Sequence, residues 1–362
     1  MGREPEAGRA CCLVGAAIMI PIPSDLGEYH LDRLIDHGNF GAVYEAHDIH
    51  LGRKLALKVV PIDDPRNAGE IFEKIQEASL QYRSRHPYVI QVNSVVLLSW
   101  DGHACVGIDM EYVDGGSLQH ELASRFISCH DCLRYFAQIL SGLEHLHTKG
   151  ILHRDIKPSN VMVAKSGIRL GDFGLAGIVS ETWAPYAVVY KTHRAPEWFS
   201  GAPCSVQSDI YATGMTLFRC LNNISDWHSK CETIEDREQV IRSGRLVTTI
   251  GFEPFVPDKL RRIVNKATNP RLEHRYQSAS EMQCALNSLR PLIDWRRLST
   301  YRWTGSQNVP KGDDKNYLPT VSGRRVEVWC NRRRIQDKCH EYQQPENALA
   351  AAHEYIADTT LM

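Results

Sequence analysis

Apolar and polar residues alternate with a period of two through much of the chain between residues 28 and 113, a pattern typical of β-strands. Several of these stretches are rich in valine, isoleucine and other β-formers. One segment, residues 68–83, has the spacing of a helix instead. We therefore expect a small antiparallel sheet with a single helix, its strands covering residues 31–35, 42–46, 54–60, 91–100 and 104–110.

The pattern becomes helical after residue 114. Apolar residues recur every three or four positions between Leu133 and Leu146, with Ser128 placed to cap the start of this helix and Gly150 to end it. Two short strands and further helices follow, up to about residue 289. The sequence therefore predicts an α+β fold of two lobes, a sheet-rich N-lobe at 28–113 and a mostly helical C-lobe at 114–290, with ligands bound between them.

The last seventy residues form a separate unit in this interpretation. Residues 291–314 are polar and predict a linker, and residues 315–362 predict a small ββα-like module with strands at 325–330 and 334–342 and a helix at 345–357. The module is locally rich in arginine. Two interpretations fit this charge, a solvated hairpin face or a surface for docking or nucleic acid.

Residues 1–27 predict a disordered tail or an artefact of the assigned start, with Met19 as an alternative first residue. A signal peptide is the other interpretation, but acidic residues precede the apolar run and no clear cleavage site follows it. That run, residues 10–23, is shorter than the roughly 20 apolar residues that span a bilayer. We therefore expect no membrane span.

Composition excludes few classes of protein but sets the compartment. The formal net charge is -1, so nothing global indicates nucleic acid as a partner. The 11 cysteines are odd in number and scattered, which favours a reducing, cytoplasmic location over a disulfide framework. Cys129 and Cys132 have CxxC spacing. They could serve a zinc or redox site, or they could be incidental core and surface cysteines.

Three motifs downstream of the predicted cleft carry most of the chemistry. The run from His153 to Asn160 contains Asp155, suited to a general base, and Lys157, suited to offset charge on a transferring phosphoryl group. Asn160 and, further on, Asp172 offer hard oxygen ligands for Mg²⁺. The triplet Ala195-Pro196-Glu197 follows.

Two upstream features complete the set. Gly38 and Gly41 lie in a turn between two predicted strands, where backbone amides can approach phosphate oxygens; this context excludes a P-loop and a dinucleotide fingerprint. Lys58 lies inside an apolar strand and needs a counter-charge, which Glu77 on the predicted helix can supply.

In this order and spacing the motifs resemble those of the eukaryotic-type protein kinase superfamily, serine/threonine branch, over residues 29–289. The resemblance implies a bilobal kinase-like fold and an ATP- and Mg²⁺-dependent enzyme that phosphorylates protein hydroxyls and itself. It implies Met110 as gatekeeper and structural roles for Asp209 and for a Glu197–Arg275 pair. Asp155 and Lys157 would be catalytic, Asn160 and Asp172 would bind metal, and the ATP-binding residues would be Ile35, Gly38, Gly41, Val43, Ala56, Lys58, Glu77, Glu111 and Val113.

Some positions depart from the family pattern. Asp36 stands where the family has the first glycine of the loop. Gln81 stands where the family has an apolar residue, and Tyr190 stands where serine/threonine kinases usually have a threonine near the acceptor. A scaffold that uses the fold without catalysis, and a kinase of small molecules, are therefore the alternatives. Arg154 beside Asp155 suggests a switch by phosphorylation of the activation loop. The candidate acceptors there are Ser180, Thr182 and Tyr186.

Overall fold

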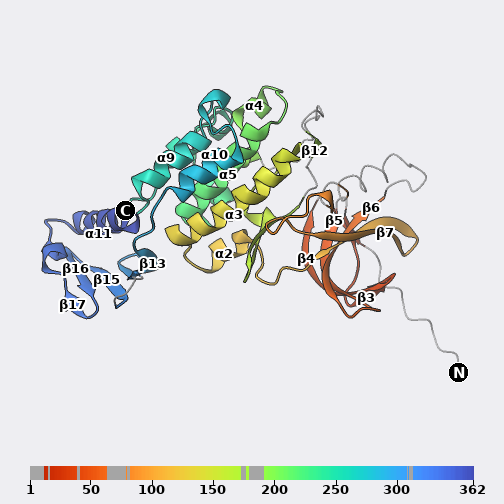
Figure 1. The fold of residues 1–362 in the computed structure, drawn as a ribbon, viewed down its shortest axis with the longest axis horizontal. Coiled ribbons are helices and arrows are strands. Elements are labelled where there is room, and N and C mark those ends of the chain that lie inside the picture. The colour runs from red at the N-terminus through yellow and green to blue at the C-terminus, as the bar shows by residue number, and fades with distance from the viewer. Residues whose placement is uncertain are drawn as a thin grey trace.

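The computed structural model describes residues 12–14, 17–38, 41–62, 79, 82–172, 177–178, 191–307, 309 and 313–362. Its three parts lie in a row in Figure 1, with a curled sheet at one end, a block of helices in the middle and a small blue module at the other end. The predicted α+β, two-lobed fold with an added C-terminal module is therefore confirmed.

The N-lobe is a six-stranded antiparallel sheet that curls around its own core. Its strand order is β3-β4-β5-β6-β8-β7, so strands next to each other in the chain are mostly neighbours in space. All five predicted strands are present. Their bounds are β4 Tyr29–Gly38, β5 Gly41–Asp48, β6 Lys54–Pro61, β7 Val92–Trp100 and β8 His103–Glu111.

The N-terminal segment contributes more to this lobe than its predicted disorder implies. β1 (Cys12–Val14) pairs with β2 (Ala17–Met19), and β3 (Ser24–Leu26) adds a strand to the edge of the sheet beside β4. Ile20 and Leu26 are 4% and 1% exposed in the sheet core. The segment folds because these two apolar side chains are buried there. Residues 1–11 lie outside the described part.

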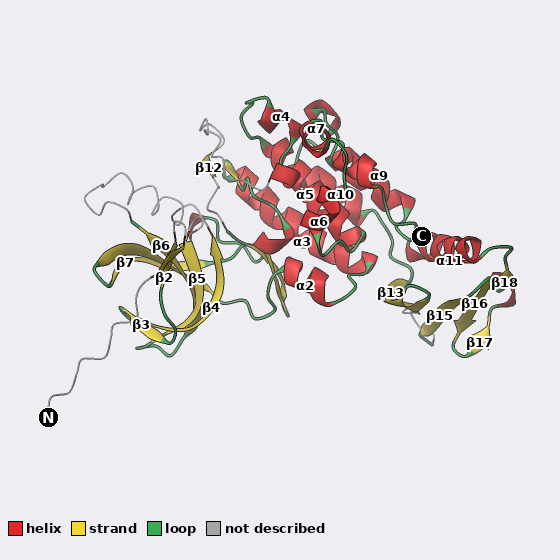
Figure 2. Ribbon diagram, turned by 180° about the vertical axis from the view of Figure 1, so that it is seen from behind, coloured by secondary structure: helices red, strands yellow, loops and turns green. Residues whose placement is uncertain are grey.

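The C-lobe is built around α3 (Cys129–Thr148) and α5 (Val206–Leu221), which Figure 2 shows at its centre. As predicted, the Ser128 side chain caps α3 by accepting a bond from the Asp131 amide, and Gly150 follows it with a φ of 72°. Within the described residues, no helix is both long and apolar enough to cross a membrane. The remaining helices are α2 Leu118–Ser124, α4 Pro196–Phe199, α6 Trp227–Glu232, α7 Arg237–Arg242, α8 Leu246–Ile250, α9 Asp258–Ala267 and α10 Ala279–Asn287.

The C-terminal module is a twisted sheet with one helix, α11, over one face. The predicted helix and first hairpin strand are present, as α11 and β16. The segment 291–314, predicted as a linker, instead holds β13 and β14. Their alternation is masked by polar residues, yet it buries Trp295 and Trp303. The elements are β13 Asp294–Ser299, β14 Arg302–Gln307, β15 Lys315–Ser322, β16 Arg325–Cys330, β17 Arg333–Arg334, β18 His340–Glu341 and α11 Pro345–Thr360.

The module packs tightly on the C-lobe. The Trp303 ring lies 5.2 Å from the Phe126 ring and 5.0 Å from the Phe255 ring, both in the C-lobe. Arg296 of β13 forms an ion pair with Asp131 at the start of α3. Trp303 belongs to the same buried cluster as the C-lobe core. The module and the C-lobe therefore share one hydrophobic core.

Candidate active site

The residues predicted to carry the chemistry lie on a short loop between β9 (Ile151–Leu152) and β10 (Val161–Ala164), with a 3-10 turn, η1, at Pro158–Asn160. The Asp155 carboxylate is the centre of this loop. Its Oδ2 atom accepts hydrogen bonds from Lys157 Nζ at 2.7 Å and from Asn160 Nδ2 at 2.9 Å. The loop therefore brings together three of the predicted side chains.

Asn160 holds the loop closed through its amide nitrogen, while its Oδ1 atom accepts only a long bond from the Ser159 hydroxyl at 3.4 Å. Its Nδ2 atom also donates to the Asp155 backbone carbonyl at 2.8 Å, so both bonds go to groups that can only accept. This fixes Nδ2 on the Asp155 side and Oδ1 on the other side. The Asn160 oxygen is thus suited to an oxygen-preferring cation.

His153 ties the loop to the chain before Asp172. Its Nε2 atom lies 3.1 Å from the Gly171 carbonyl, which can only accept, and the Asp155 amide donates to its Nδ1 at 3.3 Å. These partners require a neutral ring with the proton on Nε2. Burial lowers the pKa of His153, in agreement with a neutral ring. His153 therefore has a structural role in holding the loop.

Asp209 on α5 fixes the start of the same loop. Its carboxylate accepts the backbone amides of His153 and Arg154, both at 2.8 Å, and lies 3.0 Å from His147 Nε2. Burial alone would raise the pKa of Asp209, but the bonds and charges of His147 and His153 leave it lowered. Arg154 has a φ of 65°, which these bonds stabilise.

Lys58 and Asp172 join the two lobes. Lys58 lies in β6 with a side chain 9% exposed, and its Nζ atom is 3.3 Å from Asp172 Oδ1. Asp172 is 42% exposed, and the preceding Gly171 amide donates to the Asn160 carbonyl at 2.9 Å. Asp172 is therefore linked to the Asp155 loop through the bond of its neighbour Gly171 to Asn160. Its carboxylate contacts Lys58 and is also exposed to solvent.

The glycine turn closes the β4–β5 hairpin. Gly38 pairs with Gly41, and Gly41 has a φ of 117°. A Cβ atom at Gly41 would lie 2.3 Å from the Val59 carbonyl oxygen, so only glycine fits. The Asp36 carboxylate accepts the His37 amide at 2.8 Å, turned toward its own strand. Asp36 thus forms a local backbone contact in this hairpin.

An apolar patch lies beneath this turn. Val43, Ala56 and Met110 belong to one cluster in the N-lobe, and Met162 of the C-lobe strand β10 packs against it. Ala56 pairs with Met110 across β6 and β8. Ile35 is 41% exposed at the edge. The patch offers apolar side chains of the kind that a purine ring can contact.

The chain leaves this patch at residues 111–113, the predicted hinge. The Glu111 side chain accepts the Gln91 amide at 2.9 Å, and the Glu111 amide donates to the Gln91 carbonyl at 2.9 Å. Val113 is partly buried. The hinge backbone is therefore anchored on one side and half-open at Val113.

A charged network that sequence reasoning missed links the hinge to the glycine-turn strands. Glu45 of β5 accepts bonds from Arg33 at 2.6 Å and from the Tyr112 hydroxyl at 3.0 Å, and pairs with Lys54 at 2.5 Å. Lys54 Nζ also lies 4.0 Å from the centre of the Tyr112 ring. The period-two alternation that puts Arg33, Glu45 and Lys54 on one sheet face was the available signal.

Acid is expected to weaken this network, because the bonds from Lys54 and Arg33 lower the pKa of Glu45 from 4.5 to about 2. A lowered folded-state pKa gives stability that is present above pH 4.5 and lost as the pH falls toward 2. The difference in unfolding free energy between wild type and Glu45→Gln should therefore shrink as the pH falls through this window. Denaturant titrations at several pH values measure this difference. Glu354→Gln, at an exposed position of α11, is the control. A difference that stays constant would contradict the network.

The described chain resumes at residue 191, in a 3-10 turn, η2, at Lys191–His193. Burial, and next the charges of Arg219, Lys157 and Arg194, lower the pKa of His193. Burial also lowers the pKa of Arg194, against the opposing effect of the Asp155 charge. The turn packs against α5, and the same helix holds the Asp155 loop through a bond from Thr216 Oγ1 to the Ile156 carbonyl at 3.4 Å.

Glu197 lies in the first turn of α4, directly after η2. It is joined to Arg275 by two bonds, at 2.8 Å and 2.7 Å, and the two side chains are 6% and 0% exposed. This buried pair was expected from the resemblance, and it fixes the end of the segment to the C-lobe. The predicted Glu77, and the positions Gln81, Ser180, Thr182, Tyr186 and Tyr190, lie outside the described residues.

The CxxC pair fits the packing interpretation. Cys132 is fully buried, and burial raises the pKa of Cys129 to about 12, so its thiolate form is disfavoured. Across the part of the chain that the structure describes, no group of three or more His, Cys, Asp or Glu residues could hold a metal ion. Neither thiol has the low pKa of a redox or zinc-binding cysteine.

Comparison with known proteins matches the site to a family. The model for the protein kinase domain covers residues 29–285. The chain is 32% identical over 264 residues to a probable serine/threonine-protein kinase of Streptomyces coelicolor, covering 71% of this chain and 39% of that protein.

Two further relatives have similar names. The serine/threonine-protein kinase PrkC of Bacillus subtilis is 29% identical over 294 residues, 77% of this chain and 42% of that protein. The probable serine/threonine-protein kinase PknB of Lactococcus lactis is 30% identical over 260 residues, 70% and 40% of the two chains. This chain thus spans about two fifths of the length of these relatives, and residues 286–362 lie beyond the family match.

Proposed function

This chain belongs to the protein kinase family, in its serine/threonine branch, and we propose that it transfers the γ-phosphoryl group of ATP to serine and threonine hydroxyls of proteins, with Mg²⁺. The observation that carries the proposal is the loop in which Lys157 and Asn160 both donate to Asp155. The Lys58–Asp172 pair next to this loop supports it. These side chains suit a reaction that depends on positioning and charge stabilisation.

The roles follow from the chemistry of each group. Asp155 accepts hydrogen bonds and can orient the acceptor hydroxyl and take its proton. Lys157, at 2.7 Å from that carboxylate, can offset negative charge on the phosphoryl group in transfer. The patch of Val43, Ala56 and Met110 would hold the purine, with Ile35 at its edge and the backbone of Glu111 and Val113 at the hinge.

The nucleotide phosphates would lie between the glycine turn and the metal ligands. Gly38 and Gly41 allow backbone amides to approach phosphate oxygens, and Lys58 adds a positive charge. The Asn160 amide oxygen and the Asp172 carboxylate fit Mg²⁺, which prefers few protein oxygens together with phosphate. Bound Mg²⁺ would neutralise charge that develops on the phosphates. Glu77 is proposed as the second partner of Lys58.

The test is phosphate transfer by the purified full chain. With Mg²⁺ and labelled ATP, it should label a generic acceptor protein on serine or threonine, and a chelator should stop the labelling. Lys58→Met should lower the rate by about 10²-fold or more, because a buried cation beside the phosphates is removed. Phosphoamino-acid analysis of the acceptor measures both the rate and the acceptor type.

Lys165→Met, at an exposed turn, is the matched control and should leave the rate unchanged. Labelling that persists in Lys58→Met or without Mg²⁺ would contradict the proposal. Absence of Mg²⁺-dependent ATP binding would indicate a scaffold, and phosphate found on small alcohols but never on protein would indicate a small-molecule kinase.

We also infer autophosphorylation, with Ser180, Thr182 and Tyr186 as candidate acceptors, and a cytoplasmic location. The described cysteines are free, which supports a reducing compartment. Phosphosite mapping of the wild type and of Lys58→Met tests the autophosphorylation. A phosphate that also appears in Lys58→Met would come from another enzyme.

A further inference from the structure

A pocket of about 280 Å³ opens in the C-lobe between η2 and the helices α6 and α7. Its base is formed by Trp227 and Cys231 of α6 and by Ile241 of α7, all buried. The Trp227 Nε1 atom donates to Thr192 Oγ1 at 2.8 Å, which fixes η2 against α6. The pocket therefore has a rigid, mostly apolar base and one wall made by the turn at Lys191–His193.

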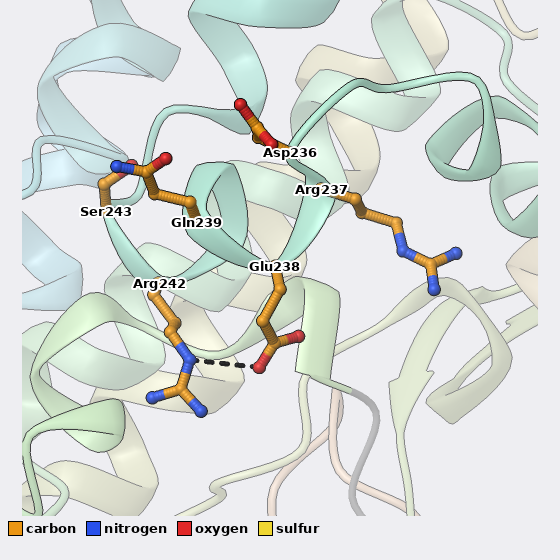
Figure 3. Close-up of a pocket in the computed structure, with 6 residues that line it drawn as sticks. All are labelled: Asp236, Arg237, Glu238, Gln239, Arg242 and Ser243. Carbon is orange, nitrogen blue, oxygen red and sulfur yellow. Dashed lines mark hydrogen bonds and ion pairs between the residues drawn. The ribbon is translucent and has the colours of Figure 1, made fainter.

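Two cations stand at the rim of this pocket without a counter-charge. Lys191 and Arg237 are exposed, and neither forms an ion pair with any part of the chain that the structure describes. The acid at the rim, Glu238, is already paired with Arg242 at 3.0 Å. Arg237 points away from this pair in Figure 3, which shows the adjoining hollow on α7.

The other charged or titratable side chains beside the rim do not pair with these cations. Asp236 lines the adjoining hollow next to Arg237 but points away from it in Figure 3. His228 lies 3.0 Å from Glu232 on α6, so that carboxylate is also engaged. A partly exposed cation gains by meeting an anion, and two cations around one pocket favour a carboxylate or a phosphate over a neutral group. The rim therefore selects for negative charge.

The pocket is close to the place where an acceptor hydroxyl would react. The loop of Asp155 and the pocket are held by the same stretch of α5, where Thr216 Oγ1 donates to the Ile156 carbonyl at 3.4 Å and the Phe218 ring lies 6.3 Å from the Trp227 ring. Trp227 in turn donates to Thr192, which lines the pocket together with Lys191. A peptide whose hydroxyl reaches Asp155 would thus pass this rim within a few residues.

We propose that the pocket formed by Lys191, Arg237 and Trp227 binds an acidic side chain of the protein substrate, a carboxylate or a phosphoserine, close to the phosphorylated residue. This inference rests on the proposed kinase activity and adds its substrate class. Lys191 and Arg237 then determine specificity through charge, and the base of Trp227, Cys231 and Ile241 contacts the apolar part of the bound residue.

The test uses a peptide taken from a site that the full chain phosphorylates in a generic acceptor. Each position beside the hydroxyl is replaced in turn by Glu, Gln, Lys or phosphoserine. At one position, Glu and phosphoserine should raise kcat/KM about three- to tenfold over Gln, as expected for two partly exposed ion pairs, mainly through KM. High ionic strength should reduce this preference.

The double variant Lys191→Glu, Arg237→Glu should reverse the preference, favouring Lys over Glu at that position, while kcat with the Gln peptide stays near wild type. Loss of structure alone cannot produce such a reversal. Arg262→Glu, an exposed cation on α9, is the control and should keep the acidic preference.

Three outcomes overturn the inference. They are a wild type with no acidic preference, a preference that survives the double charge reversal, and a preference lost equally in Arg262→Glu. If the full chain fails to phosphorylate even the generic acceptor, the proposed kinase activity itself is contradicted. The two failures are therefore distinct.

Discussion

Asp155→Asn is expected to lower kcat by about 10²- to 10⁴-fold while the KM for ATP changes little. The Asp155 Oδ2 atom accepts from Lys157 and Asn160, and an asparagine there can take no proton. If the amide nitrogen of the new asparagine took the place of Oδ2, it would also face the donors of Lys157 and Asn160. Steady-state kinetics measures the loss, and titration with a fluorescent ATP analogue checks that nucleotide still binds.

Asp101→Asn is the matched control for this change. Asp101 lies in the β7–β8 turn with a φ of 49°, a conformation that asparagine adopts readily, so activity should stay at the wild-type level. Full activity in Asp155→Asn would mean that Asp155 does not orient or deprotonate the acceptor, and the proposed mechanism would fail.

Short sequence separation explains why the Asp155 loop could be predicted. Asp155, Lys157 and Asn160 lie within six residues, so one motif brings their side chains together. Lys58 and Asp172 are 114 residues apart, and the counter-charge that the sequence predicts for Lys58 is Glu77, not Asp172. The contact needs the whole N-lobe sheet to bring β6 over the loop, which no local pattern contains.

The parts that sequence reasoning missed carry no motif and form only when segments far apart in the chain come together. Glu45 was unremarkable in the sequence, and it bonds to Arg33, Lys54 and Tyr112 only once three strands and the hinge are assembled. The strands β13 and β14 alternate too weakly for detection, since each has only short runs of apolar residues and arginines occupy half of their exposed positions. Their stability comes from Trp303, which the C-lobe buries.

Removal of Arg275 is expected to have the largest effect on stability. Its five N–H donors are all bonded, two to Glu197 and three to backbone carbonyls. The guanidinium also lies 4.9 Å from the centre of the Tyr211 ring. Arg275→Ala leaves Glu197 buried without its cation, which should lower the free energy of unfolding by about 3–5 kcal/mol.

Denaturant unfolding of single and double variants separates the ion pair from the burial that surrounds it. Arg275→Met with Glu197→Met should lose less stability than the two single changes added together, because no charge is then left unpaired. Arg242→Ala breaks the exposed pair with Glu238, where the side chains are 55% and 54% exposed, and should cost at most about 0.5 kcal/mol. Equal losses in Arg275→Ala and Arg242→Ala would contradict a stabilising role for the buried pair. A large loss in Arg275→Ala, together with a smaller loss in the double methionine variant, would mean that the unpaired charge of Glu197 accounts for much of the cost.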